Sequence, residues 1–117
     1  MRILICDDEQ EFLHELVEAV IGRGFTVSAA SSGSEAIALL ASGTFDVFVT
    51  DIRLPGERFE NLVGQLSHMG SRAPATIIAM TGHADEQTID AVRLVCGWPV
   101  LLKPFPVGDL LSIVQFG

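Results

Sequence analysis

Asp46-Val47-Phe48-Val49-Thr50-Asp51 is the stretch of sequence that decides the fold of this chain. Its residues 47–49 are β-branched or aromatic, which is typical of a strand buried on both faces of a sheet. The run ends in Thr50 and Asp51, and Pro55-Gly56 then marks a turn. Because an unpaired carboxylate is costly to bury, we expect Asp51 to reach water, a cation or a partner at the strand end.

The composition favours one acidic globular domain. The chain has 117 residues, of which 49% are hydrophobic, so it suits one core. Its formal net charge of -8 argues against direct nucleic-acid binding, which needs a basic patch, and favours cationic partners or metal ions. We expect residues 1–117 to form a single domain, either stand-alone or cut from a longer protein.

Two further features indicate a cytoplasmic setting. Cys6 and Cys96 lie far apart in no CxxC arrangement, which fits a reduced compartment with Cys6 as a small buried residue. No apolar run approaches the roughly 20 residues of a membrane span, and no signal peptide precedes the first strand-like run.

Strand-like and helix-like patterns alternate along the chain. We expect strands at residues 3–6, 25–29, 47–49, 76–80 and 99–102, and helical apolar stripes within residues 12–21, 36–40, 59–69, 89–95 and 110–114. Ser32 and Glu35 match a capping box for the second helix, and Asp85 could cap the fourth. Five strand-helix units predict an α/β fold with a parallel, doubly wound, flavodoxin-like sheet of order 2-1-3-4-5.

Polar residues follow four of the predicted strands. They are Asp7 and Asp8, Asp51, Thr81, and Lys103. The carboxyl ends of parallel strands share one edge, so three acids would meet one hydroxyl and one ammonium there. Two like charges about 4 Å apart repel by roughly 4 kcal/mol at an effective dielectric of 20. The acids therefore need a cation or a proton, and oxygen ligands of this kind suit Mg²⁺.

The same groups fit phosphoryl chemistry. A carboxylate such as Asp51 can attack phosphorus and hold an acyl phosphate. A metal ion and Lys103 can neutralise the added charge. The Thr81 hydroxyl and the backbone N–H groups of Arg53 and Gly82 can donate hydrogen bonds to phosphoryl oxygens, and Gly82 allows close approach.

Across essentially its whole length the chain resembles the receiver domains of response regulators, the CheY-like phosphoacceptor modules of two-component signalling. The matching pieces are Asp7-Asp8-Glu9, Asp51-Ile52-Arg53-Leu54-Pro55-Gly56, Met80-Thr81-Gly82-His83 and Lys103-Pro104-Phe105. Each piece alone is weak evidence, whereas all four in this order, each at a strand end, are strong evidence. The sequences of the segments at residues 51–56 and 81–83 are most similar to those of receivers attached to DNA-binding output domains or found in hybrid sensor kinases.

The resemblance implies an Mg²⁺-dependent site. Asp51 would be phosphorylated by a histidine kinase or phosphotransfer protein. Asp8 and Asp51 would bind Mg²⁺ directly, together with the carbonyl of Arg53, and Asp7 would act mainly through a water molecule.

The resemblance also assigns roles to the residues opposite the metal. Thr81 would contact the phosphoryl group, and Lys103 would pair with Asp51 beforehand and with the phosphoryl group afterwards. The Lys103-Pro104 bond would be cis, which costs an X-Pro bond only about 0.5–1 kcal/mol. Such a domain promotes only its own phosphorylation and slow hydrolysis, and then engages an effector or forms a homodimer.

Three features depart from the family pattern. Val100 stands where receivers carry Tyr or Phe, Phe59 stands where a small residue is expected, and residues 97–99 look one residue short. Trp98 precedes Val100 by two residues, so on a regular strand it would share the same face and could substitute for the missing ring. These departures leave the acceptor site whole and put the output surface, formed by the fourth helix, fifth strand and fifth helix, in doubt.

Alternative interpretations remain at this point. The domain could be an interaction module that keeps the fold but switches poorly, or a phosphatase with an aspartate nucleophile, although Arg53 stands where such an enzyme needs a second acid. Asp7 and Asp8 could simply cap the first helix. His83 lies next to the predicted site and could influence dephosphorylation.

Overall fold

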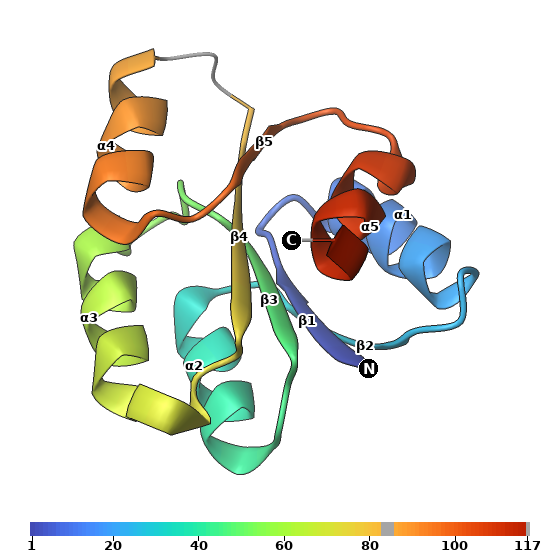
Figure 1. The fold of residues 1–117 in the computed structure, drawn as a ribbon, viewed down its shortest axis with the longest axis horizontal. Coiled ribbons are helices and arrows are strands. Elements are labelled where there is room, and N and C mark those ends of the chain that lie inside the picture. The colour runs from blue at the N-terminus through green and yellow to red at the C-terminus, as the bar shows by residue number, and fades with distance from the viewer. Residues whose placement is uncertain (83–85, 117) are drawn as a thin grey trace.

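The computed structural model, which describes residues 1–82 and 86–116, is a five-stranded sheet between two layers of helices (Figure 1). The strands are β1 (Arg2–Cys6), β2 (Thr26–Ala30), β3 (Val47–Asp51), β4 (Thr76–Thr81) and β5 (Val100–Leu102). The helices are α1 (Gln10–Ile21), α2 (Gly33–Ser42), α3 (Phe59–Met69), α4 (Glu86–Cys96) and α5 (Val107–Phe116), with a short 3-10 helix η1 at Gly70–Arg72.

The strand order is β2-β1-β3-β4-β5, and every neighbouring pair is parallel. Helices α1 and α5 cover one face of the sheet, whereas α2, α3 and α4 cover the other (Figure 1). The predicted fold class and strand order are therefore confirmed. In such a sheet the crevice between β1 and β3, where the order reverses, opens at the carboxyl ends of the strands.

The central strand β3 is buried at all five positions, as its composition predicts. Because successive side chains point to opposite faces, Val49 belongs to the apolar cluster under α1 and α5, and Phe48 to the cluster under α2 and α3. The strand extends to Asp51, two residues beyond the predicted core run. The Asp51 carboxylate is thus part of the most buried strand.

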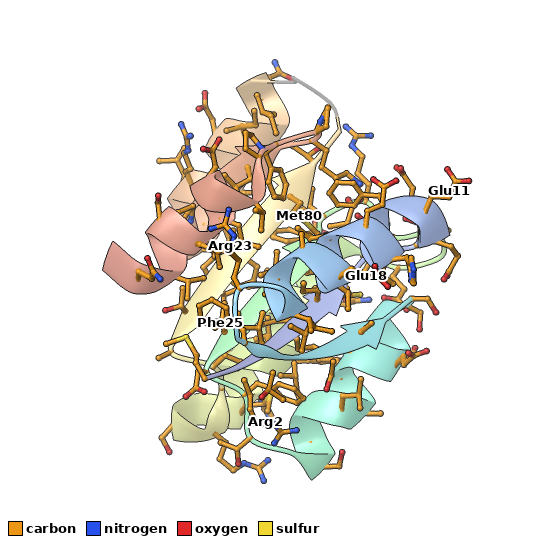
Figure 2. All side chains as sticks on the ribbon, turned by 90° about the vertical axis from the view of Figure 1, so that its right-hand side faces the viewer. Arg2, Glu11, Glu18, Arg23, Phe25 and Met80 are labelled. Atoms are coloured by element: carbon orange, nitrogen blue, oxygen red, sulfur yellow. The ribbon has the colours of Figure 1, made fainter. Side chains whose placement is uncertain are left out.

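Helix α1 is amphipathic, as the spacing predicts. Glu11 and Glu18 lie on its outer side, whereas Met80 lies inside the domain (Figure 2). Ile21 was expected to belong to the buried stripe, but it is the last helical residue and is 51% exposed. The buried stripe of α1 therefore ends at Val20.

The N-terminus of α2 is capped twice. The Ser32 hydroxyl oxygen accepts a hydrogen bond from the Glu35 N–H at 3.1 Å, which confirms Ser32 as the N-cap. The other half of the predicted capping box is wrong, because the Glu35 carboxylate accepts from the Ser31 hydroxyl at 3.4 Å instead of reaching back to Ser32. Glu57, from the loop after β3, accepts a hydrogen bond from the Ser34 N–H at 3.1 Å.

Replacing Ser32 with alanine is expected to lower the free energy of unfolding by about 1 kcal/mol, because the Glu35 N–H loses its acceptor. Chemical denaturation would measure the change. Ser31→Ala is the control, since its hydroxyl bonds only a side chain near the surface, and it should change stability by less than about 0.5 kcal/mol. Equal losses in the two variants would contradict the capping role.

Cys6 is buried, and its thiol donates a hydrogen bond to the Ser32 carbonyl oxygen at 3.4 Å. Burial raises the pKa of this thiol to about 12. Cys6 is therefore the inert packing residue that its position in β1 predicts.

The C-terminal third differs from the sequence prediction in detail. Strand β5 begins at Val100 rather than at residue 99, and α5 spans Val107–Phe116, which contains the predicted apolar stripe at residues 110–114. In α4 the predicted apolar stripe is only partly buried, because Val92 is 2% exposed and Val95 is 72% exposed. The proposed cap Asp85 and the neighbouring His83 lie outside the described residues.

A helix able to cross a bilayer would need a longer apolar run than any helix in the described part of the chain provides.

Candidate functional site

Backbone ladders carry four polar residues to one edge of the sheet. The Asp7 N–H donates to the Ala30 carbonyl at 3.1 Å, which extends the β1–β2 pairing past the end of β1. Asp51 is the last residue of β3. The Lys103 N–H donates to the Thr81 carbonyl at 2.8 Å, so the residue after β5 is anchored beside the end of β4. The predicted edge therefore brings Asp7, Asp51, Thr81 and Lys103 together.

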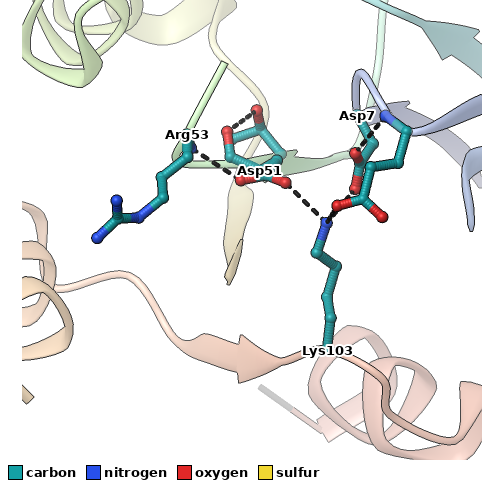
Figure 3. Close-up of polar contacts among 6 residues, drawn as sticks. Asp7, Asp51, Arg53 and Lys103 are labelled. Atoms are coloured by element: carbon teal, nitrogen blue, oxygen red, sulfur yellow. Dashed lines mark hydrogen bonds and ion pairs between the residues drawn. The ribbon is translucent and has the colours of Figure 1, made fainter. Parts of the chain in front are cut away.

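Lys103 is the centre of this site. Its Nζ lies 2.7 Å from Asp51 Oδ2 and 2.9 Å from Asp7 Oδ2, and Figure 3 shows its side chain reaching between the two carboxylates. Glu9 Oε1 is a third acceptor at 3.4 Å. The lysine side chain is only 7% exposed, so its charge-assisted contacts with Asp51 and Asp7 are largely shielded from water, whereas Glu9 is 65% exposed.

The remaining oxygens of the two buried acids accept backbone hydrogen bonds. Asp7 Oδ1 accepts from the Glu9 N–H at 2.9 Å, and Asp51 Oδ1 accepts from the Arg53 N–H at 2.8 Å. These bonds orient both carboxylates while Lys103 binds their other oxygens. Asp7 thus shapes the turn into α1, whose N-cap Glu9 has no side-chain hydrogen bond to cap it.

Burial and pairing act in opposite directions on the charges. Burial raises the pKa of the Asp51 carboxyl above its usual value, and the hydrogen bonds from Lys103 and the Arg53 N–H only partly offset this. Burial alone would lower the pKa of the Lys103 ammonium, but its hydrogen bonds to Asp51 and Asp7 raise that pKa well above the usual range. Lys103 therefore carries a positive charge at neutral pH.

Three acids at this edge fit a divalent cation. Asp7, Asp8 and Asp51 each offer a carboxylate oxygen, and these oxygens lie within 4.8 Å of one another. Asp7 and Asp51 are buried, whereas Asp8 is half-buried. One lysine does not balance this acidic cluster, and carboxylate oxygens are the ligands that Mg²⁺ prefers. The residues present therefore fit a magnesium ion.

The predicted phosphoryl contacts surround the same carboxylate. Thr81 is fully buried at the end of β4. A Cβ atom placed on Gly82 would lie 3.9 Å from Lys103 Cε, so Gly82 borders the lysine stem. The Arg53 N–H already donates to Asp51, and the Arg53 side chain is exposed.

Val100 and Trp98 lie in a different environment, beside α3 and α4. Both contact an apolar cluster that contains Ile52, Ala79 and Val92. The regular strand that would align Trp98 with Val100 does not extend to Trp98, because β5 begins at Val100. Trp98 instead packs edge-to-face on Phe59, with ring centroids 5.6 Å apart and an interplanar angle of 83°. Phe59 and the short segment at residues 97–99, two of the places where the chain departs from the family pattern, thus pack against each other.

A mostly apolar groove separates α3 from α4. It encloses about 610 Å³, and its apolar lining comes from Ile52, Phe59, Val63, Ala91, Val92 and Val95. Ile52 directly follows Asp51, so one wall of this groove is covalently continuous with the site.

Sequence reasoning missed the roles of two residues at the site. Glu9 was noted only as part of an acidic run, but its carboxylate reaches Lys103. Phe12 packs against the core, as the apolar spacing of residues 12–21 predicts, but the Lys103 Nζ also lies 4.7 Å from the centroid of its ring. Glu9 is the N-cap of α1, and Phe12 follows it by three residues, so both stand at the start of this helix, just after the end of β1, which is the signal that could have found them.

A parallel sheet of order β2-β1-β3-β4-β5 with these polar residues at one edge is an α/β, flavodoxin-like fold of the CheY type. The chain belongs to the response regulator receiver domain family, whose model matches residues 3–115. Receiver domains are signalling domains of two-component systems and not turnover enzymes.

Individual relatives agree with this assignment. The chain is 34% identical over 112 residues to a response regulator receiver protein of Anaeromyxobacter sp. (strain Fw109-5), covering 96% of this chain and 46% of that protein. The response regulator TrrA of Thermotoga maritima, solved in complex with Mg²⁺ and beryllofluoride, superposes with a TM-score of 0.80 at 25% identity, covering 97% and 96% of the two chains.

A response regulator of Burkholderia pseudomallei, solved with a phosphorylated aspartic acid, a calcium ion and citrate, has a TM-score of 0.82 at 27% identity, covering 98% of this chain and 66% of that one. The chain thus spans less than half the length of the Anaeromyxobacter relative. It covers 96% of the Thermotoga structure and 66% of the Burkholderia structure.

Proposed function

We propose that this domain is the phosphoacceptor switch of a two-component phosphorelay, in which Asp51 receives a phosphoryl group from a histidine kinase or phosphotransfer protein. The observation that carries the proposal is the position of Asp51. It is a buried carboxylate at the end of the central strand, 2.7 Å from the Lys103 ammonium and within an acidic cluster suited to a cation.

The reaction is an in-line transfer. An Oδ atom of Asp51 forms a bond to phosphorus while the bond between phosphorus and the donor atom breaks, and the donor leaves with that electron pair. Lys103 shifts from Asp51 toward the new phosphoryl oxygens. Thr81 and the backbone N–H groups of Arg53 and Gly82 supply further hydrogen bonds. The same groups serve slow hydrolysis of the aspartyl phosphate, so the domain acts only on its own phosphorylation.

Mg²⁺ is the proposed cofactor, held by Asp8, Asp51 and the carbonyl of Arg53, with Asp7 acting through a water molecule. The bound ion supplies positive charge to the phosphoryl oxygens as transfer proceeds. The neighbour solved with Mg²⁺ and beryllofluoride supports this assignment, as does the grouping of the three acids.

Magnesium is expected to stabilise the folded domain by mass action. At a concentration 100 times the Kd, Mg²⁺ should raise the free energy of unfolding by about 2.7 kcal/mol, and Asp8→Asn should remove most of this gain. Urea denaturation with and without Mg²⁺ would measure it. Asp109→Asn, an exposed acid of α5, is the control and should keep the full gain. An equal gain in the Asp8 variant would contradict the assigned ligands.

The proposed function is tested most simply with a small phosphodonor. Acetyl phosphate with Mg²⁺ should convert the protein to a singly phosphorylated form, followed as a time course by intact mass. Chelating the metal should stop the conversion. A wild-type protein that stays unmodified, or that turns over small phosphate esters repeatedly, would refute the proposal.

Residues 1–117 are proposed to be one receiver domain, acting in the cytoplasm without contacting nucleic acid or membrane itself. Its proposed partners are the phosphodonor protein and a downstream effector protein or domain, with a homodimer as a further option. The chain covers 46% of its Anaeromyxobacter relative, which leaves room in such proteins for an output region.

A second candidate is a receiver-fold interaction module with little switching. Val100, half-buried against Ile52 and Ala79, motivates it, because the side chain at this position is not an aromatic ring that could turn inward. Beryllofluoride with Mg²⁺ should shift NMR signals at the site and along the groove between α3 and α4. If signals of β5 and α5 shift as far as those of the site, the usual output face responds after all. If none shift beyond the site, the second candidate is correct.

A further inference from the structure

The Lys103 ammonium has an aromatic partner as well as its three carboxylates. Its Nζ lies 4.7 Å from the centroid of the Phe12 ring, within the range of a cation–π contact. Because the lysine side chain is only 7% exposed, little water competes with this contact. A desolvated cation–π pair is stronger than one at the surface.

The Phe12 ring is itself held in place by the segment that carries the lysine. Phe105, two residues after Lys103, packs edge-to-face on Phe12 with centroids 5.9 Å apart and an interplanar angle of 78°. Both rings also pack against the apolar cluster under α1 and α5. The ring therefore presents a stable face to the ammonium.

The Lys103 side chain is long and flexible, and three carboxylates compete for its ammonium group. Glu9, at 3.4 Å, is 65% exposed, whereas Asp51 and Asp7 are buried and closer. An ammonium drawn outward to Glu9 would be displaced from the atom that receives the phosphoryl group. A wall that restricts the stem keeps the charge beside Asp51.

We propose that Phe12 is a positioning residue for phosphoryl transfer, whose ring holds the Lys103 ammonium between Asp51 and Asp7 and away from Glu9. This role rests on the proposed phosphoacceptor function. During transfer the new Asp51–phosphorus bond brings three phosphoryl oxygens to the site, and the ring keeps the ammonium within reach of them. Loss of the ring lowers the maximal rate more than it raises the KM for the donor, because the proposed role of Phe12 is to position Lys103 and not to bind the donor.

Phe12→Leu and Phe12→Tyr test this role directly. Phosphorylation by acetyl phosphate at saturating Mg²⁺ is expected to slow about 3- to 30-fold in Phe12→Leu and to stay within about 2-fold of wild type in Phe12→Tyr. Phe25→Leu is the matched control. Phe25 packs against the same cluster and has no cation over its ring among the described contacts, so its loss should leave the rate unchanged.

A spectroscopic readout separates positioning from packing. Lys103 is the single lysine of the sequence, so lysine-selective labelling gives one set of side-chain NMR signals. Its ε-methylene protons should be shifted upfield by the Phe12 ring current in the wild type and in Phe12→Tyr, and not in Phe12→Leu. If Phe12→Leu fails to fold, a ring-fluorinated phenylalanine at position 12 keeps the shape, weakens the cation–π contact and should slow the reaction.

Three outcomes would overturn the proposal. They are an unchanged rate in Phe12→Leu, an equal loss in Phe25→Leu, or no upfield shift in the wild type. A wild-type protein that accepts no phosphoryl group at all would instead refute the proposed function, and the role of Phe12 would fall with it. The wild-type time course therefore tells the two failures apart.

Discussion

Lys103→Met is expected to slow phosphorylation by about 100- to 1000-fold and to destabilise the domain at neutral pH. The rate falls because no other cation of the described residues lies within 4 Å of Asp51 to neutralise the incoming charge. The fold weakens because Asp51 and Asp7 lose their shared ammonium at 2.7 and 2.9 Å while both stay buried. Breaking a buried pair in this way costs about 3–5 kcal/mol.

The penalty should depend on pH with a defined sign. Removing the ammonium raises the folded-state pKa of the Asp51 carboxyl further above its unfolded value near 3.9. When the folded-state pKa of a carboxyl is raised, the folded state keeps its stability at acid pH. It loses stability as the pH rises above the unfolded-state pKa of that carboxyl. The difference between wild type and Lys103→Met should therefore be small near pH 4 and full near pH 7.

Urea denaturation at the two pH values measures this difference. Arg23→Met, which removes an exposed positive charge, is the control and should change stability little at either pH. In the wild type, the stabilisation from Lys103 should persist up to about its unfolded pKa of 10.5 and be lost above it, because its folded pKa is raised. A penalty in Lys103→Met that is equal at both pH values would contradict the ion-pair account.

Asp51→Asn is expected to abolish phosphorylation while leaving the fold intact. The amide lacks the nucleophilic carboxylate, but its oxygen can still accept a hydrogen bond from the Arg53 N–H or from Lys103. Without metal the variant should be more stable than wild type at neutral pH, because burial raises the pKa of Asp51 and so penalises its ionised form. That gain should vanish below about pH 4, where the wild-type carboxyl is protonated.

Denaturation without metal, and again with Mg²⁺, checks both parts of this prediction. Magnesium should stabilise the wild type more than Asp51→Asn, because the amide is a poorer ligand. Asp46→Asn, at the opposite end of β3, is the comparison variant and should accept the phosphoryl group at the wild-type rate. Phosphorylation of Asp51→Asn at any appreciable rate would show that another residue is the acceptor.

Most of the fold could be predicted from local patterns in the sequence. The apolar runs at β1, β3 and β4 have lengths and turn signals that strands share, and the strand ends then follow from parallel pairing. The prediction that Asp7, Asp51, Thr81 and Lys103 share one edge needs only this topology. Each of them could thus be placed without knowing a single side-chain contact.

Contacts between distant segments could not be predicted in the same way. Val95 lies on the apolar stripe of α4 yet is 72% exposed, because α3 and α4 stand apart around a groove instead of closing over it. The Phe12–Lys103 contact joins the first helix to the end of the last strand, and helical spacing shows only that Phe12 faces inward. Side-chain partners of this kind depend on the position and angle at which each helix packs on the sheet. The hydrophobic periodicity of the sequence does not predict these.

The most direct test of the account is the chemical location of the phosphoryl group. After incubation with acetyl phosphate and Mg²⁺, borohydride reduces an aspartyl phosphate to homoserine, and peptide mass mapping then identifies the modified residue. We predict conversion at Asp51 alone, with none in Asp51→Asn. Conversion at Asp7 or Asp8, or a phosphoryl group that resists borohydride, would contradict the central claim.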